Sequence, residues 1–120
     1  MSSDTGMTQD CIFCKIHQGQ VKSDFLFRDE RCYAIRDIVP KAPVHLLIIP
    51  NQHFTYLTNM TPEQESLVGH LFLVAQDMAK QEGVVGTGYR LIINQGPDSG
   101  QEVAHLHLHL LGGSALRAMG

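Results

Sequence analysis

Three histidines alternate with leucines near the end of the chain, and imidazole is the side chain best suited to proton transfer and nucleophilic attack near neutral pH. They are His105, His107 and His109. Successive side chains of a β-strand point to opposite faces. The alternation therefore predicts a strand over residues 103–111, with the imidazoles on one face and the leucines on the other. A helix would scatter both sets around its axis.

This row of imidazoles has three candidate explanations. A solvated strand face is the plainest, although such faces more often carry Thr, Lys and Glu. In a metal site, same-face neighbours roughly 6.6 Å apart could share one ion with Zn–N bonds of about 2.0 Å, but all three would converge only on a sharply bent strand. In a catalytic site, His107 would attack a substrate while its neighbours position that substrate or move protons. The spacing favours this third explanation.

The segment before the histidines is rich in turn residues. It reads Gln95-Gly96-Pro97-Asp98-Ser99-Gly100-Gln101-Glu102, and its length fits a hairpin loop. Glycine adopts positive φ and lets the backbone approach a ligand closely, and exposed backbone N–H groups can hold a phosphate. Most such loops are only turns, but this one directly precedes three histidines, which favours phosphate binding.

A Cys-x-x-Cys pair, Cys11 and Cys14, opens the part of the chain that we expect to be ordered. A single copy of this motif is weak evidence for a metal or redox site. The alternative is two small buried residues on a short helix that ends at Gly19. That helix would have one apolar face, formed by Ile12, Phe13 and Ile16.

Five strands and two helices are expected to position these residues. Helix signals are strongest at Thr61, a capping residue, followed by Pro62 and by Gln64, which completes a capping box. They predict a long helix over residues 62–82. Strands are predicted over residues 25–29, 32–37, 44–50, 89–94 and 103–111. Short connections between them indicate an α+β fold, an antiparallel sheet of about five strands with one long and one short helix on one face.

The composition fits a single soluble domain. The chain has 120 residues, 43% of them hydrophobic and 18% charged, and a net charge of −3. These values argue against a general nucleic-acid or membrane surface, and no apolar run approaches the roughly 18 residues of a transmembrane helix. Residues 1–10 are polar and small and are interpreted as a loose tail without a signal sequence. Three cysteines without evident pairing then predict a cytoplasmic, reducing location.

The run His105-Leu106-His107-Leu108-His109-Leu110-Leu111 resembles the His-φ-His-φ-His-φ-φ signature of the histidine triad (HIT) family, where φ is apolar. The resemblance is to the Hint branch and extends over residues 11–113, which would be the HIT domain, followed by a short C-terminal tail over 114–120. The triad and its Gly-Gln lead-in are specific, whereas the apolar strands are not. Further similar segments are residues 11–16, Arg36-Asp37-Ile38, residues 43–50, 89–96 and 100–103. Members of this branch are usually homodimers that join their sheets.

The resemblance implies a hydrolase that cleaves purine nucleoside phosphoramidates, which are nucleoside 5′-monophosphate derivatives, through a nucleotidyl-histidine intermediate. It implies four catalytic histidines: His107 as nucleophile, His109 against the phosphate, His45 orienting the nucleophilic ring, and His105 as the first of the triad. A carboxylate only accepts hydrogen bonds, which suits the role implied for Asp37 at the ribose hydroxyls. The implied nucleotide-binding residues are Ile12, Phe13, Ile16, Ile35 and Ile38 at the base, and Asn94, Gly100, Gln101, Glu102 and Val103 near the phosphate, with His107 and His109. We expect no cofactor to be required for this chemistry.

A structural zinc site is a further implication of the resemblance. Some HIT relatives bind zinc at positions that correspond here to Cys11, Cys14, His53 and His105, a closed set of two thiolates and two imidazoles. The competing interpretation is reduced thiols in the core and a surface His53. Two other functions also stay open: a purine nucleotide-binding regulatory module with incidental hydrolysis, and a metal-binding protein in which the triad itself holds the ion.

Overall fold

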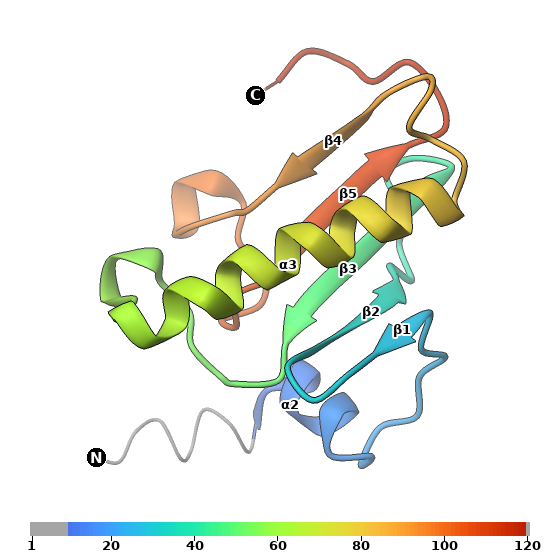
Figure 1. The fold of residues 1–120 in the computed structure, drawn as a ribbon. Coiled ribbons are helices and arrows are strands. Elements are labelled where there is room, and N and C mark those ends of the chain that lie inside the picture. The colour runs from blue at the N-terminus through green and yellow to red at the C-terminus, as the bar shows by residue number, and fades with distance from the viewer. Residues whose placement is uncertain (1–9, 120) are drawn as a thin grey trace.

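The computed structural model describes residues 10–119, which form a five-stranded antiparallel sheet with a long helix across it (Figure 1). The strand order is β1-β2-β3-β5-β4. The strands are β1 (Phe27–Arg28), β2 (Cys32–Arg36), β3 (Val44–Pro50), β4 (Tyr89–Ile92) and β5 (Leu108–Gly112), and the helices are α2 (Ile12–His17), α3 (Pro62–Gln81) and the 3-10 turns η1 (Leu57–Asn59) and η2 (Pro97–Ser99). The expected α+β fold with one long and one short helix is confirmed. The tail expected over residues 1–10 lies, apart from Asp10, outside the described residues.

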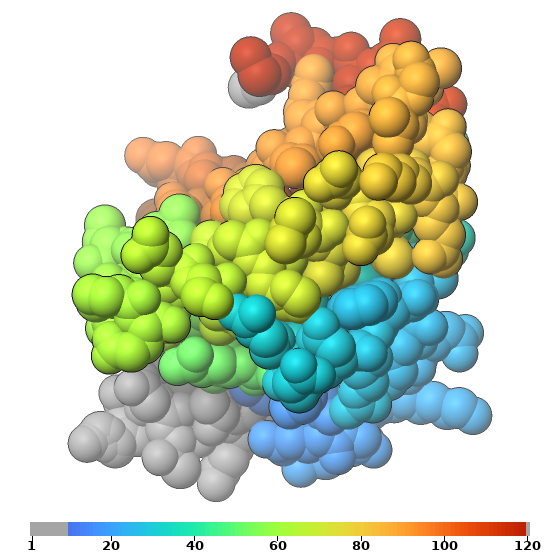
Figure 2. Space-filling model, viewed as in Figure 1, coloured from blue at the N-terminus to red at the C-terminus, as the bar shows by residue number. Residues whose placement is uncertain are grey.

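Helix α3 begins at the predicted capping box. The Thr61 backbone N–H donates to Oε1 of Gln64 at 2.9 Å, and Gly83, at φ +73°, follows the last turn. One face packs on β3 and β5, where Leu71 and Ala75 are fully buried against Leu46, Ile48 and the alternating leucines of the histidine motif. The space-filling view shows α3 and its neighbours covering this face of the sheet (Figure 2). Among the described residues, we find no helix whose length and hydropathy would suit a bilayer span.

The short helix α2 covers the opposite face of the sheet, so the prediction that both helices share one face is wrong. Phe13, Cys14 and Ile16 of α2 pack in a second core cluster, which the sheet completes with Tyr33, Ile35, Leu47 and Ile49. The physical reason is that four consecutive residues at the start of β2 are buried. A strand that is apolar on both faces needs cover on both.

Strand β5 is shorter than predicted, and the first two histidines of the motif precede it. The Leu106 N–H donates to the Phe54 carbonyl at 2.7 Å, so this stretch pairs with the segment after β3 instead of joining the strand ladder. The predicted alternation nevertheless persists, because Leu106, Leu108 and Leu110 are all 1% exposed or less. The three histidines therefore share the face opposite α3.

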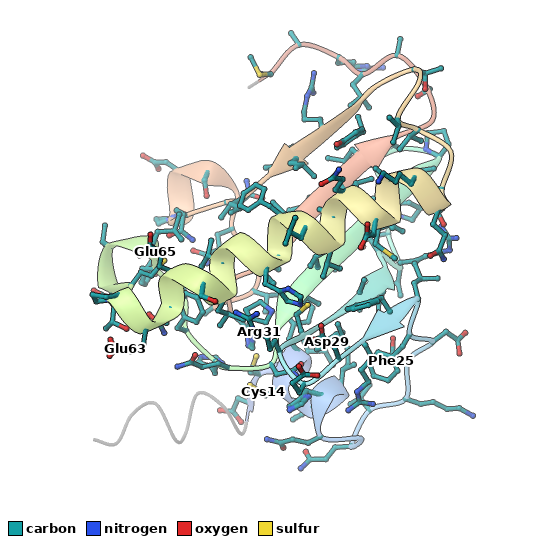
Figure 3. All side chains as sticks on the ribbon, in the orientation of Figure 1. Cys14, Phe25, Asp29, Arg31, Glu63 and Glu65 are labelled. Carbon is teal, nitrogen blue, oxygen red and sulfur yellow. The ribbon has the colours of Figure 1, made fainter. Side chains whose placement is uncertain are left out.

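Asp29, in the turn between β1 and β2, connects this edge of the sheet to α3 (Figure 3). Its Oδ1 accepts the N–H groups of Arg31 and Cys32 at 2.8 Å each, and its Oδ2 lies 2.7 Å from Nε2 of His70 on the helix. Burial alone would raise the pKa of Asp29, but the His70 contact and the two backbone N–H groups outweigh it and hold the pKa below its usual value.

Candidate active site

Two adjoining chambers meet at His107 and His109. One, of about 500 Å³, we call the apolar chamber because its wall includes apolar side chains of α2, of the sheet and of the loops between them. The other, of about 560 Å³, we call the polar chamber; it runs along β4, β5 and the segment that follows β5. The residues that line both are Asp37, Lys41, Glu102, His107 and His109. A ligand that spans both chambers must therefore pass these two histidines.

His107 is held with one ring nitrogen free. Its Nδ1 lies 2.7 Å from the backbone carbonyl oxygen of His105, and a carbonyl only accepts, so Nδ1 carries the proton in the neutral ring. The unprotonated Nε2 is then available as a nucleophile. The edge of the Phe13 ring packs at 5.1 Å between centroids against this imidazole. The His107 ring is thus oriented by one hydrogen bond and one apolar contact.

His109 has the opposite tautomer, set by a chain of hydrogen bonds. The Lys41 backbone N–H donates to Nδ1 of His45 at 3.0 Å, which places the proton of neutral His45 on Nε2. That Nε2 lies 2.9 Å from Nδ1 of His109 and donates to it, so His109 presents an Nε2–H. His45 is bonded to His109 and lines neither chamber. Any orienting effect of His45 on His107 would therefore pass through His109.

Burial keeps these supporting rings neutral near pH 7. Desolvation lowers the pKa of His109 to about 4, and the neighbouring His107 and His45 act in the same direction. Desolvation also lowers the pKa of His45, although the Asp37 carboxylate 3.4 Å away opposes it. Neutral His109 can donate a hydrogen bond to a phosphoryl oxygen without carrying a charge.

The residues expected around the base lie together in the apolar chamber. Its wall includes Ile12, Phe13, Ile16, Ile35 and Ile38. Val103, which we expected near the phosphate, lines this chamber and not the polar one. Ile38 is 95% exposed and so lies at the rim, whereas Phe13 is 5% exposed and lies inside. Asp37 lies where the two chambers meet, and its Oδ1 accepts the Val39 N–H at 2.9 Å. Its Oδ2 lies 3.4 Å from Nε2 of His45. A carboxylate oxygen can accept more than one hydrogen bond, so Asp37 can still accept from a ligand beside the apolar wall.

The loop between β4 and β5 contributes Asn94, Gly100 and Glu102 to the polar chamber. Gly100, at φ +84°, has the left-handed conformation that favours glycine. Gln101, which we expected near the phosphate, lines neither chamber. Its Oε1 accepts the Gly96 N–H at 2.8 Å and its Nε2 donates to the Val103 carbonyl at 3.3 Å. Gln101 therefore braces the loop from within.

The side chains of four residues lie close together near His107: Cys11, Cys14, His53 and His105. Nδ1 of His105 lies 3.3 Å from Sγ of Cys11, 3.6 Å from Sγ of Cys14 and 3.1 Å from Nδ1 of His53, which is itself 3.3 Å from Sγ of Cys14. A tetrahedral zinc would need about 3.3 Å between two nitrogens and about 3.5 Å between nitrogen and sulfur, from Zn–N and Zn–S bonds of about 2.0 and 2.3 Å. Nε2 of His105 donates to the Pro50 carbonyl at 2.9 Å, which leaves Nδ1 unprotonated. The four residues fit a zinc ion.

The triad does not converge on one ion of its own. Within residues 10–119, the groups of side chains close enough to share a metal place His105 with the cysteines and His109 with Asp37 and His45. His107 belongs to neither group. This geometry does not support the third function considered from the sequence, an ion held by all three triad histidines.

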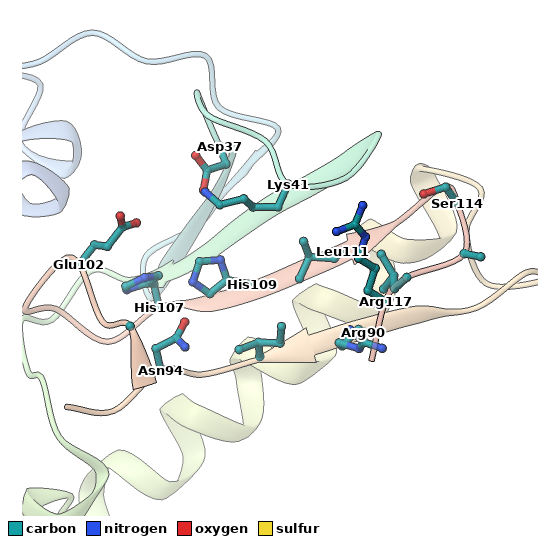
Figure 4. Close-up of a pocket in the computed structure, with 14 residues that line it drawn as sticks. Asp37, Lys41, Arg90, Asn94, Glu102, His107, His109, Leu111, Ser114 and Arg117 are labelled. Atoms are coloured by element: carbon teal, nitrogen blue, oxygen red, sulfur yellow. The ribbon is translucent and has the colours of Figure 1, made fainter. Parts of the chain in front are cut away.

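Several residues of the polar chamber were missed by the sequence analysis: Lys41, Arg90, Ile92, Leu111 and the four residues from Ser114 to Arg117. Figure 4 shows Arg90 and Arg117 at the end of the chamber away from Glu102, with His107 and His109 in between. Arg90 could have been found, since it is two residues from Ile92 and four from Asn94 and thus shares their strand face. Residues 114–117 have no periodicity that indicates their position.

Comparison with known proteins identifies the family of this chain. The family model described as the HIT domain matches residues 18–116. The chain is 43% identical to the purine nucleoside phosphoramidase of Escherichia coli over 94% of this chain and 95% of that protein. It superposes on the crystal structure of a HIT family hydrolase from Legionella pneumophila with a TM-score of 0.86 and 42% identity, covering 89% of this chain and 96% of that one.

A third similar structure is that of a Zn-bound histidine triad family protein from Mycobacterium smegmatis, with a TM-score of 0.75 and 31% identity over 88% of this chain and 76% of that one. The family model and the Escherichia coli relative each cover most of the chain. The motif, the fold and these comparisons lead to one conclusion. The chain belongs to the HIT family and is one of its hydrolases.

Proposed function

We propose that this protein hydrolyses purine nucleoside phosphoramidates, with His107 as the nucleophile. One observation carries the proposal: the unprotonated Nε2 of His107 belongs to a ring that lines both chambers. An apolar chamber bordered by the Asp37 carboxylate suits a nucleoside, and the polar chamber suits the amine. The 43% identity to a protein named purine nucleoside phosphoramidase supports the same substrate class.

The reaction would proceed in two displacements at phosphorus. In the first, Nε2 of His107 bonds to phosphorus, the P–N bond breaks, and the departing amine takes a proton from solvent. The ring, still protonated on Nδ1 and bonded to the His105 carbonyl, becomes a nucleotidyl-imidazolium. In the second, the oxygen of a water molecule bonds to phosphorus and the P–N bond to His107 breaks. The attacking water releases one proton to solvent. Covalent catalysis divides one difficult step into two easier ones.

His109 and the loop before the triad would stabilise charge on the phosphoryl oxygens. The Nε2–H of His109 is a donor whose direction is set by His45, and preorganised donors at a developing negative charge are a large part of many rate enhancements. Gly100 brings backbone to the same chamber. These groups are in place before substrate binds, because each is held by a hydrogen bond or a loop contact within the protein.

His107→Ala tests this proposal. We expect it to abolish turnover of an adenosine 5′-phosphoramidate while adenosine monophosphate still binds, measured by calorimetry, because the ring supplies the bond to phosphorus and little of the pocket wall. Near-normal hydrolysis by the variant would contradict the mechanism. Slow turnover by the parent protein, with tight nucleotide binding and a cellular role that the variant retains, would favour the regulatory module instead.

We also propose that Cys11, Cys14, His53 and His105 bind a structural zinc ion. The fit of their donor distances supports this, as does the Zn-bound relative. A bound zinc would supply a structural link between the N-terminal segment with α2 and the sheet. Metal analysis of protein purified without chelator should give near-stoichiometric zinc, and Cys14→Ser should lose it, whereas Cys32→Ala, outside the cluster, should keep it. An intact, zinc-free parent protein would contradict the proposal.

A homodimer in a reducing, cytoplasmic location completes the proposal. Strand β4 is an edge strand, and on α3 the side chains of Phe72 and Leu73 are 43% and 61% exposed. An open edge and exposed apolar side chains favour pairing with a second copy. Three buried free thiols support the reducing location. Sedimentation velocity should give a dimer, and a purely monomeric boundary at micromolar concentration would contradict it.

A further inference from the structure

The polar chamber has an uneven distribution of charge. Three cationic side chains line it, Lys41, Arg90 and Arg117, against two carboxylates, Asp37 and Glu102. Figure 4 shows Glu102 beside His107 and the two arginines beyond His109, along the direction of β5. The chain as a whole has a net charge of −3. A cationic end in an acidic protein, next to the reacting phosphorus, needs an explanation.

The arginines of this end differ from the other arginines of the chain in having no partner. Arg28 donates to the His17 carbonyl at 2.7 Å, Arg31 to Oγ of Ser66 at 2.7 Å, and Arg36 forms a bidentate pair with Glu82 at 2.8 and 2.9 Å. Within residues 10–119, neither Arg90 nor Arg117 makes a hydrogen bond or an ion pair. The two arginines without an acceptor are the two that line the polar chamber. Their guanidinium groups are available to a ligand.

The strand register places Arg90 within reach of a group bonded to the phosphorus. Ile92 is directly opposite His109, and Arg90 is opposite Leu111, one same-face step further along the sheet. That step is roughly 6.6 Å, which an arginine side chain can span. Arg90 is half-buried, so its stem is packed while its guanidinium can face the chamber.

The direction of the reaction determines which part of the substrate meets these arginines. In a displacement at phosphorus the attacking and leaving atoms lie roughly in line. If the nucleoside occupies the apolar chamber, the polar chamber beyond His109 is left for the leaving amine. The cationic end therefore contacts the amine's substituent.

We propose that Arg90 and Arg117 bind an anionic group on the leaving amine, so that the preferred substrates are nucleoside 5′-phosphoramidates of acidic amines. The guanidinium fork matches the two oxygens of a carboxylate or of a phosphate-like group. This inference rests on the proposed phosphoramidase activity and narrows its substrate class. The inference leaves the expected nucleoside monophosphate part of the substrate as proposed above. It adds a selectivity for the charge of the leaving amine.

Three synthetic substrates test the proposal: adenosine 5′-phosphoramidates of glycine, of glycinamide and of aminomethylphosphonate. Glycine and glycinamide have nearly the same shape and differ in charge. We expect kcat/KM to be higher for an acidic substrate than for the amide by about fivefold or more, the size of one partly exposed ion pair. The preference should shrink as salt concentration rises. A preference for glycine would identify a carboxylate ligand, and one for the phosphonate a phosphate-like ligand.

Variants connect the preference to the two side chains. Arg90→Gln and Arg117→Gln should each lower the ratio of kcat/KM for the acid to that for the amide, and the double variant should bring it near one. Arg31→Gln, which loses a bond to Ser66 outside both chambers, should leave the ratio unchanged. Equal kcat/KM for all three substrates, or a preference that survives in the double variant, would overturn the inference. Failure to hydrolyse any of the three would instead contradict the proposed phosphoramidase activity.

Discussion

Replacing His45 with leucine tests the hydrogen-bonded chain that sets the proton of His109. His45 is 4% exposed, and leucine has a similar volume, so packing changes little. The substitution removes the acceptor of the Lys41 N–H and the donor to Nδ1 of His109. The Nδ1 atom of His109 is then left without its partner, and the ring is free to take the other tautomer.

The expected loss can be estimated from these two bonds. An unsatisfied buried polar group costs about 1–3 kcal/mol, which should appear as a lower free energy of unfolding. If His109 no longer points an N–H at the phosphoryl group, the transition state loses a hydrogen bond to a charged group, worth about 1.5–3 kcal/mol. That corresponds to a fall in kcat of about 10- to 150-fold. His45→Gln keeps an N–H donor near His109 and should lose less than about tenfold.

Steady-state kinetics on an adenosine phosphoramidate and urea unfolding would measure both effects, and nitrogen-15 NMR of the imidazoles would report the tautomers directly. We expect Nε2–H on His109 and Nδ1–H on His107 in the parent protein. The reasoning is refuted if the leucine variant folds and keeps kcat within about twofold of the parent. It is equally refuted if His109 of the parent carries its proton on Nδ1.

Three further predictions concern stability. Leu71→Ala, at a fully buried position, should lower the free energy of unfolding in urea by about 2–5 kcal/mol, whereas Leu73→Ala, at a 61% exposed position, should change it by less than about 0.5 kcal/mol. The pKa of Asp29 in the folded protein is held below its usual value. Its contribution to stability is therefore present above the unfolded pKa of about 3.9 and is lost as pH falls through the pKa of the folded state. Asp29→Asn should remove this part of the acid transition. The pKa of His109 is about 4 in the folded state and about 6.5 in the unfolded chain. The unfolded chain therefore binds the proton first as pH falls, and the free energy of unfolding should decrease from about pH 6.5 towards pH 4. His109→Gln should make this decrease smaller, measured as urea midpoints against pH.

The alternation of side chains could be predicted from the sequence better than the pairing of the backbone. Strand β3 has the predicted bounds, Val44–Pro50, because an apolar run ends at a proline. Strand β5 begins at Leu108, five residues after the predicted start, although the leucines and histidines still alternate between faces. The Leu106 N–H donates to Phe54 because the segment after β3 lies beside it. The position of that segment depends on long-range packing, which no local sequence pattern predicts.

The position of α2 shows a second limit of the same kind. The sequence predicted this short helix from its apolar residues. The face of the sheet that α2 covers, however, depends on long-range packing. A signal was present in β2, where Cys32-Tyr33-Ala34-Ile35 offers no polar face. Strands without alternation are usually covered on both sides, and that rule would have placed a helix on each face.

The candidate site also has residues that the sequence predicted and residues that it did not. The positions expected for the base and the nucleophile came from the resemblance to the HIT family, and Phe13 and His107 do lie in contact. The resemblance also placed Gln101 near the phosphate, but its side chain turns into its own loop, because its amide satisfies backbone groups there. Arg90 was not predicted as a site residue because single cationic residues are common in strands. Its position near the site follows from its pairing with Leu111 on β5, which the sequence does not show.

His105 contributes to two neighbouring sites through different parts of one residue. Its imidazole lies with Cys11, Cys14 and His53, but the atom that orients the His107 ring is its main-chain oxygen. Every amino acid has that oxygen. Evolution could therefore exchange the imidazole at this position, together with both cysteines, without deleting the acceptor on which the neighbouring ring depends. The proposed zinc site and the proposed nucleophile are therefore adjacent but genetically separable.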